Sequence, residues 1–256
     1  MAGTAPRSGR VDPWRLARDT AEGAGVALRP LRTPEDADHL LGVLAVTWGG
    51  QELAREMVVA LGESGNVCWG AFDGDRILGY VLGWAGVDEE GLHVHSHMLA
   101  TLPPARGRGI GAALKFAQRA QALEQGIDVV RWTFDPMVTR NAIFNLNRLG
   151  TTADRFHRAF YGEMGDEMNR GERSDRLVAR WDLAREPGPR VAPAGALRVP
   201  VPADYATVRA ADAVAASAAR EGVAAGIEAA LADGLVAAAF DVDASAFVFL
   251  PREDAS

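Results

Sequence analysis

Apolar and polar positions along the chain follow the periods of alternating strands and helices, which predicts an α/β protein. Apolar runs typical of strands occupy residues 26–31, 67–72, 77–84, 92–102, 129–134, 153–161 and 176–183. Between them, helical spacing of apolar residues predicts helices after Thr33 and over 51–62, 110–125 and 140–149. Farther along, strands are expected at 197–201, 235–240 and 246–250, with helices over 203–210 and 213–232.

Capping and turn residues mark several of these boundaries. Thr33, Pro34, Glu35 and Asp36 form a helix start, with a threonine cap, a proline at the first helical position and acids in the first turn. This helix is expected to direct four residues inward: Leu40, Leu41, Leu44 and Val46. Gly150 suits the left-handed position that ends the helix over 140–149.

The chain divides by composition into four parts. Residues 1–25 are polar and rich in Gly and Ala, and we expect a flexible segment with one short helical stretch near Trp14. A catalytic domain is expected over 26–184 and a linker over 185–195. Of the 66 residues from Val191 to Ser256, 23 are alanine. We therefore expect 196–256 to be a small α+β extension that packs on the first domain or on a second subunit.

Composition and charge exclude several classes of function. The chain has 256 residues and a formal net charge of −7, and a single cysteine excludes a disulfide-stapled module. An acidic chain is poorly suited to nucleic acid or anionic membranes, so we expect neither partner. No apolar run has the length of a membrane span, and the first residues lack a signal peptide's apolar core, which favours a cytoplasmic location.

One stretch departs from this acidity. From Gly91 to Leu123 there is no Asp or Glu, and the stretch contains three histidines, several arginines and the only lysine, Lys115. It includes a glycine-rich turn between a strand and a helix, with the sequence RGRGIG over 106–111. Such a turn exposes the backbone N–H groups of a helix N-terminus, which suit a phosphate or pyrophosphate. The spacing matches neither a P-loop nor a dinucleotide fingerprint.

This turn resembles the acyl-CoA-binding motif of the GNAT (Gcn5-related N-acetyltransferase) superfamily. The order of elements is similar, and the runs SHMLA, RGRGIGAALKFAQ, WTFDP and RNAIFNLNRLG look like a GNAT subgroup of predicted acyltransferases. The resemblance covers about residues 26–183 and implies a mixed sheet flanked by helices. It also implies acetyl-CoA or another acyl-CoA as cofactor, with succinyl-CoA a second candidate.

The resemblance also assigns cofactor-binding positions. Backbone amides from Arg106 to Ala112 would hold the CoA pyrophosphate, and the strand segment 99–101 would run beside the pantetheine arm. Asn141 would contact the same arm or the cofactor. The cofactor-binding set is therefore Leu99, Ala100, Thr101, Arg106, Gly107, Arg108, Gly109, Ile110, Gly111, Ala112 and Asn141.

Three histidines offer candidates for the general base. His93, His95 and His97 share one face of the strand by two-residue alternation. The resemblance places His95 where histone-acetylating relatives carry a catalytic glutamate. An ordinary imidazole pKa near 6.5 suits a base at neutral pH. We expect His95 or His97 to be catalytic and His93 less so, the alternative being hydrogen-bonded structural histidines. No metal site is expected, because the strand supplies no carboxylate to complete one.

The general acid departs from the superfamily pattern. Many GNAT enzymes place a tyrosine where this chain has Leu146. Tyr161 is the replacement we would test, and the alternatives are an unassisted thiolate or proton donation by water.

Other polar residues leave alternatives open. Asp135 is expected to cap a turn rather than act in catalysis, and Cys68 to be a small core residue. An acidic loop containing Glu163, Asp166, Glu167 and Asp175 could bind an amine, whereas Arg170, Arg173 and Arg176 could bind a carboxylate. Asn145 and Asn147 offer amide hydrogen bonds, at least one of them structural.

These observations lead to one main hypothesis of function. The chain would transfer an acetyl or succinyl-type group from CoA to a primary amine of a small molecule, with an amino acid as candidate acceptor, by direct attack in a ternary complex. A homodimer is an open alternative to a monomer. The rival hypotheses are a non-catalytic acyl-CoA-binding protein and a GNAT scaffold that hydrolyses or decarboxylates thioesters.

Overall fold

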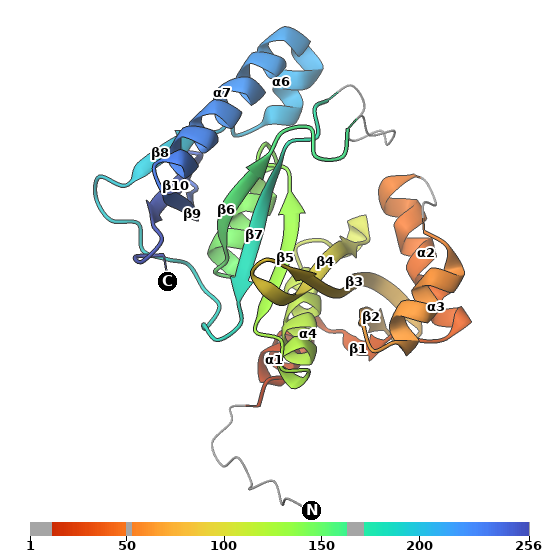
Figure 1. Cartoon of the computed structure of the whole chain (residues 1–256). Coiled ribbons are helices and arrows are strands. Elements are labelled where there is room, and N and C mark those ends of the chain that lie inside the picture. Colours follow the sequence, from red (N-terminus) through yellow and green to blue (C-terminus); the bar gives the residue numbers. More distant parts are fainter. Residues whose placement is uncertain (1–11, 50–52, 163–171, 256) are drawn as a thin grey trace, which may run out of the picture. The chain divides into compact units, whose positions relative to one another are not determined.

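The computed structural model describes residues 12–49, 53–162 and 172–255, and divides into two compact units. The first spans Met1–Asp128 and the second Val129–Ser256 (Figure 1). Strands flanked by helices in both units confirm the predicted α/β class. The boundary between the units falls inside the catalytic domain expected over 26–184.

In the residues that the structure describes, the first unit contains four strands in sequence order, each antiparallel to the next within the unit. They are β1 (Ala27–Pro30), β2 (Val67–Asp73), β3 (Arg76–Asp88) and β4 (Gly91–Thr101). The turn between β2 and β3 contains Gly74 with φ +59°, a left-handed conformation that glycine adopts without a steric penalty. The β2–β3 hairpin therefore follows from an ordinary turn signal, and β3 also pairs with β4, the strand that carries the three histidines.

Five helical segments accompany these strands in the described part of the unit. They are α1 (Arg15–Ala24), α2 (Pro34–Trp48), α3 (Arg55–Glu63), the 3₁₀ turn η1 (Pro103–Ala105) and α4 (Ile110–Glu124). The predicted start of α2 is confirmed, because Thr33 and Asp36 form a capping box. Leu40, Leu41 and Leu44 are buried as expected, but Val46 is 63% exposed. Only one face of α2 packs on β3 and β4, and Val46 lies on the other.

The N-terminal helix α1 confirms the short helical stretch that was expected near Trp14 within residues 1–25. In α1, Ala17, Ala21 and Ala24 are buried, and the helix packs extensively on α4. The guanidinium of Arg108 donates a hydrogen bond of 2.9 Å to the carbonyl oxygen of Ala24, at the end of α1. Small residues at helical spacing thus allow α1 a close approach to α4, while residues 1–11 lie outside the described part.

Within its described residues, the second unit contains six strands in the order β5-β7-β6-β9-β10-β8, and each pair of neighbours is antiparallel. They are β5 (Val129–Phe134), β6 (Thr152–His157), β7 (Arg176–Asp182), β8 (Leu197–Pro200), β9 (Leu235–Asp241) and β10 (Ala246–Pro251). The strand expected over 153–161 ends earlier, at His157. Ala159 has φ +48°, which turns the chain out of the extended conformation.

The helices of the second unit lie between its strands in the sequence, either after β5 or after β8. They are α5 (Thr139–Ala142), α6 (Tyr205–Ala211) and α7 (Ala213–Ala232), together with the π-helical segment η2 (Ile143–Arg148). The helix expected over 140–149 is therefore α-helical only in its first turn. Gly150 has φ +71°, as its role in ending the helix requires, and a Cβ there would lie 2.7 Å from the carbonyl oxygen of Gly188.

The alanine-rich extension shares a sheet with the preceding strands of the second unit. Ala153 of β6 pairs with Ala237 of β9, and β9 continues into β10 and β8. The expected linker is also anchored, because Arg190 donates hydrogen bonds to the carbonyl oxygens of Gly150 and Thr151. The expected separation of 26–184 from 196–256 therefore differs from the compact units of the structure.

Candidate active site

The histidine row lies on β4 at an irregularity in its pairing with β3. Leu82 is opposite Met98 and Gly83 is opposite Ser96, so His97 is an extra residue in β4. Such a bulge increases the local twist and re-aims side chains. It keeps His97 close to His95, at a ring-centroid distance of 5.9 Å.

Trp84 of β3 is the common neighbour of two histidines. Its ring centroid lies 5.1 Å from that of His95 and 4.7 Å from that of His97. His93 is placed differently, since its ring lies over Gly86, where a Cβ would be 2.9 Å from Nε2. The Nδ1 atom of His93 is 3.9 Å from a carboxylate oxygen of Asp88. The geometry thus groups His95 and His97 and sets His93 apart.

Burial changes the acid–base character expected of these imidazoles. Burial lowers the pKa of His95 to about 4, and the neighbouring charges of His97, His93 and Lys115 add to this effect. Burial also lowers the pKa of His97. Both pKa values therefore lie below the ordinary value expected from the sequence, although the side chain of His97 is more exposed than that of His95. Their rings stay neutral at neutral pH, with a lone pair available to accept a proton.

The glycine-rich turn forms the predicted N-terminus of α4. Gly107 and Gly109 have φ values of +80° and +91°, and Gly109 is the N-cap. Among the described residues, no side-chain hydrogen bond caps this helix, whose N-cap is a glycine. Arg106 and Arg108 are exposed, whereas Ile110 and Ala112 are buried and anchor the helix. A Cβ at Gly107 would meet nothing within 4 Å, so the backbone there is open to a ligand.

The predicted pantetheine segment is the last part of β4. Leu99, Ala100 and Thr101 are opposite Val81, Tyr80 and Gly79 of β3. A Cβ at Gly79 would lie 2.5 Å from the carbonyl oxygen of Ala100, so glycine is required for this pairing. The chain then enters the turn, where Nε of Arg106 donates to the carbonyl oxygen of Thr101.

A buried polar cluster behind β4 was not predicted as part of the site. Lys115 of α4 is only 2% exposed, and its Nζ donates hydrogen bonds to Ser96 Oγ at 3.0 Å and Gln118 Oε1 at 2.7 Å. Burial lowers the pKa of Lys115 well below its usual value. The available sequence signal was a lone lysine within the apolar helix IGAALKFAQ.

Tyr161, the candidate acid, follows β6 in the second unit. Its hydroxyl lies 3.0 Å from Oγ1 of Thr133 on β5, and its backbone N–H donates to Ser174 Oγ at 3.0 Å. The guanidinium carbon of Arg176 is 5.5 Å from the ring centroid, and the side chain is 45% exposed. The hydroxyl is thus fixed in direction and accessible. Asn141, the other predicted site residue of this unit, is half-buried in α5.

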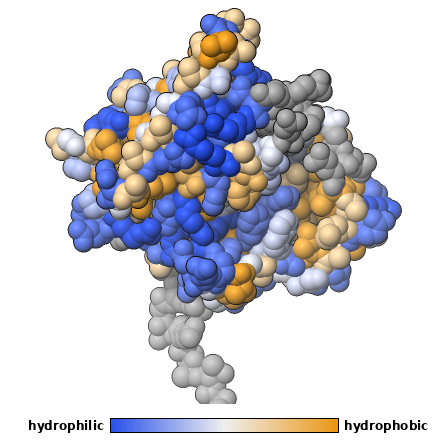
Figure 2. Space-filling view, turned by 45° about the horizontal axis from the view of Figure 1, so that its top comes forward, coloured by the Kyte–Doolittle hydropathy of each residue, from blue (hydrophilic) through white to orange (hydrophobic). Residues whose placement is uncertain are grey.

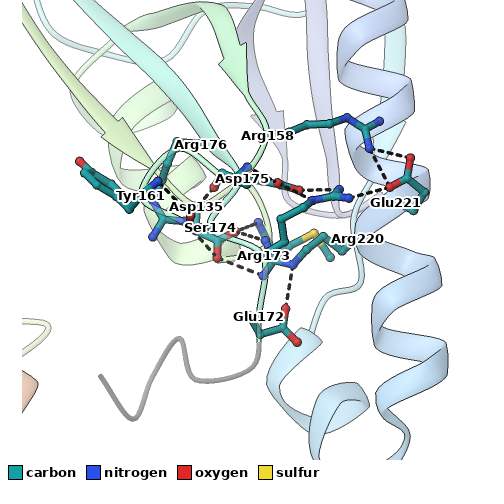
Figure 3. Close-up of polar contacts among 12 residues, drawn as sticks. Asp135, Arg158, Tyr161, Glu172, Arg173, Ser174, Asp175, Arg176, Arg220 and Glu221 are labelled. Atoms are coloured by element: carbon teal, nitrogen blue, oxygen red, sulfur yellow. Dashed lines mark hydrogen bonds and ion pairs between the residues drawn. The ribbon is translucent and has the colours of Figure 1, made fainter. Parts of the chain in front are cut away.

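An ion-pair network joins the ends of β5 and β7 to α7 (Figure 3). Arg220 of α7 donates hydrogen bonds to both carboxylate oxygens of Asp135, each at 3.2 Å. It also donates a hydrogen bond of 2.7 Å to Oε2 of Glu172. Arg173 pairs with Asp175 and with Glu221 of α7. These contacts give Arg173 a structural role, which corrects the hypothesis that it binds a substrate carboxylate.

The remaining candidates of this region have structural contacts or are not described. Arg176 is paired with Asp135 at 3.8 Å. Asp135 accepts a hydrogen bond from the backbone N–H of Met137, which confirms the expected turn cap. The buried carboxylate of Asp175 is held by Arg173, so the structure does not offer it to an amine. The other residues expected to bind a substrate amine or a substrate carboxylate lie outside the described residues: Glu163, Asp166, Glu167 and Arg170.

Three other sequence expectations concern reactivity, metals and membranes. Cys68 is buried, and burial raises its pKa to about 12, as suits an inert core residue. Among the described residues, no group of His, Cys, Asp and Glu side chains is arranged to hold a metal ion. In the same residues, no helix combines the length and apolar character needed to cross a bilayer. The face drawn in Figure 2 is mainly hydrophilic, with hydrophobic residues in small groups.

Comparisons with known proteins agree with this geometry. Residues 38–150 match the sequence model of the Acetyltransferase (GNAT) family. A Chaetomium thermophilum Naa20 structure with a bisubstrate analogue has a TM-score of 0.51 and 20% identity, covering 64% of this chain and 95% of that chain. The ribosomal-protein-S18-alanine N-acetyltransferase from Escherichia coli has a TM-score of 0.50 and 11% identity, covering 63% and 96%. At these identities the likeness shows the fold alone. No curated protein sequence matches the chain significantly.

Proposed function

Because residues 38–150 match the Acetyltransferase (GNAT) family model, we propose that the chain is a GNAT-type, acyl-CoA-dependent N-acyltransferase that acylates a primary amine of a small molecule. An acetyl group is the first candidate donor and a succinyl-type group the second, with an amino acid as candidate acceptor. The transfer is direct, in a ternary complex. A cytoplasmic location and a homodimer stay predictions from the sequence.

The N-terminus of α4 is the observation that carries the cofactor assignment. Two left-handed glycines open the backbone, no side-chain hydrogen bond from a described residue caps the helix, and Arg106 and Arg108 are exposed beside it. N–H groups and the positive end of the helix dipole stabilise an anion at this place. The residues therefore fit the pyrophosphate of CoA. Bound acyl-CoA supplies an activated carbonyl with a thiolate leaving group.

The strand that enters this turn fits the remainder of the cofactor. The backbone of Leu99, Ala100 and Thr101 would bind the pantetheine arm. One N–H of this segment would donate to the thioester carbonyl oxygen and stabilise its negative charge in the transition state. Asn141 would add a polar contact to the same arm.

His95 or His97 would act as the base. The amine nitrogen forms a bond to the carbonyl carbon while the carbon–sulfur bond breaks, and the nitrogen loses one proton to the imidazole, directly or through water. The lowered pKa of both residues keeps the ring neutral before reaction. A weakly basic ring is most effective after the nitrogen has begun to bond and has become more acidic.

The departing thiolate requires a proton to leave as the thiol. Tyr161 is the candidate donor, since Thr133 orients its accessible hydroxyl. Leu146, at the usual tyrosine position, is fully buried and cannot donate. Water is the alternative donor.

Release of CoA thiol with a panel of amines tests the proposed function. We expect acetyl-CoA or succinyl-CoA to give thiol only when an acceptor amine is present, with an N-acyl product by mass spectrometry. Tight CoA binding with no thiol release for any amine would instead indicate a binding protein. Thiol release without an acceptor would indicate hydrolysis or decarboxylation.

Substitution of the candidate base sharpens this test. His95→Gln and His97→Gln are compared with His93→Gln. The last variant is the control, because the ring of His93 is not grouped with that of Trp84. We expect a large loss of kcat in one of the first two variants, with CoA affinity nearly unchanged. Equal kinetics for all three variants and the wild type would reject the assignment of the base.

A further inference from the structure

The single lysine of the chain occupies an unusual place. Lys115 points into the interior of the first unit, where its Nζ donates to Ser96 at 3.0 Å and to Gln118 at 2.7 Å. Burying an amine is unfavourable even when hydrogen bonds compensate part of the lost hydration. A leucine or methionine would fill the same position of α4 without this penalty. Packing alone therefore does not explain the residue.

The hydrogen bond to Ser96 attaches Lys115 to the histidine row from behind. Ser96 lies between His95 and His97 in β4, and its buried side chain is on the opposite face of the strand. It is also the residue next to the bulge, opposite Gly83. Ser96, which separates the two candidate bases in the sequence, is thus held by a side chain of α4. The N-terminus of this helix is the proposed binding site of the CoA pyrophosphate.

Close packing at Gly83 shows how tightly this connection is built. A Cβ at Gly83 would lie 2.6 Å from the carbonyl oxygen of His95 and 3.1 Å from Nε2 of Gln118. A glycine at position 83 therefore allows the carbonyl oxygen of His95 and the side chain of Gln118 to lie close to β3 beside the bulge. A bulged strand has fewer ladder hydrogen bonds to define its conformation, so support from behind matters here.

We propose that Lys115, acting through Ser96, is a positioning residue that fixes the bulged segment of β4 and so places His95 and His97 beside Trp84. This inference rests on the proposed function and names a further residue for the same reaction. Lys115 does not contact the reacting atoms. It acts on the geometry and the electrostatic surroundings of the base.

The proposal has an electrostatic consequence that a purely structural role lacks. In the first unit, His95 is faced by His93 and His97 on its own strand, by the Trp84 ring on β3 and by Lys115 from α4. Burial is the largest cause of the lowered pKa of His95. The charges of His97, His93 and Lys115 contribute smaller decreases, in that order. Loss of the lysine charge is therefore expected to raise the pKa of His95.

The experiment compares Lys115→Met with Ser96→Ala and Ser96→Thr in the full chain. Ring NMR of the five histidines gives the pKa of His95, after assignment with single His→Gln variants. Steady-state kinetics give kcat, and calorimetry gives the Kd of CoA. For Lys115→Met we expect a higher His95 pKa, a kcat about tenfold to a hundredfold lower, and a Kd within about twofold of wild type.

Two comparisons separate positioning from stability. Ser96→Ala should lower kcat like Lys115→Met, whereas Ser96→Thr, which keeps the hydroxyl, should restore it. Gln121→Met is the matched control: Gln121 also lies on α4 and accepts a hydrogen bond from Trp69, away from β4. We expect this control to lower the unfolding midpoint without changing kcat or the pKa of His95.

Each outcome decides the proposal. An unchanged kcat and an unchanged His95 pKa in Lys115→Met would overturn it, whatever happens to stability. If Lys115→Met does not fold, the Ser96→Ala and Ser96→Thr pair decides by the same readouts. If the wild type transfers no acyl group to any amine, the proposed function fails, and the NMR titration still tells whether Lys115 controls the histidine.

Discussion

The side-chain amide of Asn147 forms both hydrogen bonds that a neighbouring strand would offer to Phe240. Its Nδ2 donates to the carbonyl oxygen of Phe240 at 2.8 Å, and its Oδ1 accepts from the backbone N–H at 2.9 Å. Phe240 is buried in β9. The π-helical segment η2 thereby satisfies the backbone of a strand 93 residues away.

Asn147→Leu is expected to destabilise the second unit through these two groups. The variant leaves a buried donor and acceptor without their partner, which costs on the order of 2–3 kcal/mol. Urea unfolding monitored by circular dichroism measures the loss. Arg148→Ala, at an exposed neighbouring position, should change stability by less than about 0.5 kcal/mol. Similar effects of the two substitutions would contradict the role assigned to Asn147.

The pattern of elements was predictable where the signal is local. The Thr33 capping box, the turn at Gly74 and the left-handed Gly150 all depend on a few adjacent residues. The faces of the helices were less predictable, because Val46 and Leu44 are equally apolar and only packing separates them. Local signals therefore fixed where most elements begin but not which of their residues form the core.

The candidate site was predictable in identity but not in environment. The glycine turn and the histidine alternation are visible in the sequence, whereas the bulge at His97 depends on its register with β3. The low pKa of His95 depends on burial, which no spacing of residues indicates. The same holds for Lys115, whose acceptors Ser96 and Gln118 can be identified only once α4 packs on β4.

The pH dependence of kcat should reflect the buried imidazole. Protonation removes the base, so kcat falls as pH decreases through its pKa, and for His95 that pKa is about 4. We expect kcat at saturating amine to stay nearly constant from pH 8 to about pH 6 and to fall at lower pH. A fall centred near pH 6.5, the ordinary value of histidine, would contradict the assignment to His95.

The same residue should make folding stability depend on pH. Between its folded pKa of about 4 and an unfolded value near 6.5, the unfolded state binds more protons than the folded state. The free energy of unfolding therefore decreases as pH falls through this window. Urea unfolding at several pH values measures the slope, and His95→Gln should reduce it. An unchanged slope in that variant would place the effect on other groups.

Gly109 should matter for both conformation and cofactor binding. Its φ of +91° is strained for any residue with a Cβ, and it caps the helix that would bind the pyrophosphate. We expect Gly109→Ala to weaken CoA binding about tenfold, or roughly 1.4 kcal/mol, by calorimetry. Gly42→Ala, at an exposed position within α2 where a Cβ meets nothing, should instead stabilise by about 0.5–1 kcal/mol and leave CoA affinity unchanged. Equal CoA affinity in both variants would argue against this turn as the pyrophosphate site.

The buried pair between Asp135 and Arg220 should be more sensitive to loss of one partner than to loss of both. The side chains are 14% and 6% exposed, and contact with Asp135 raises the pKa of Arg220 against the effect of its burial. Asp135→Asn leaves a buried guanidinium with less compensating charge, at a cost of about 3 kcal/mol or more. Replacing both residues, as in Asp135→Asn with Arg220→Met, removes that charge and should recover part of the loss. The exposed pair of Arg198 and Asp241 is the control, and Arg198→Met should cost less than about 1 kcal/mol. Strictly additive effects of the two buried substitutions in a double-mutant cycle would show that the pair is not coupled.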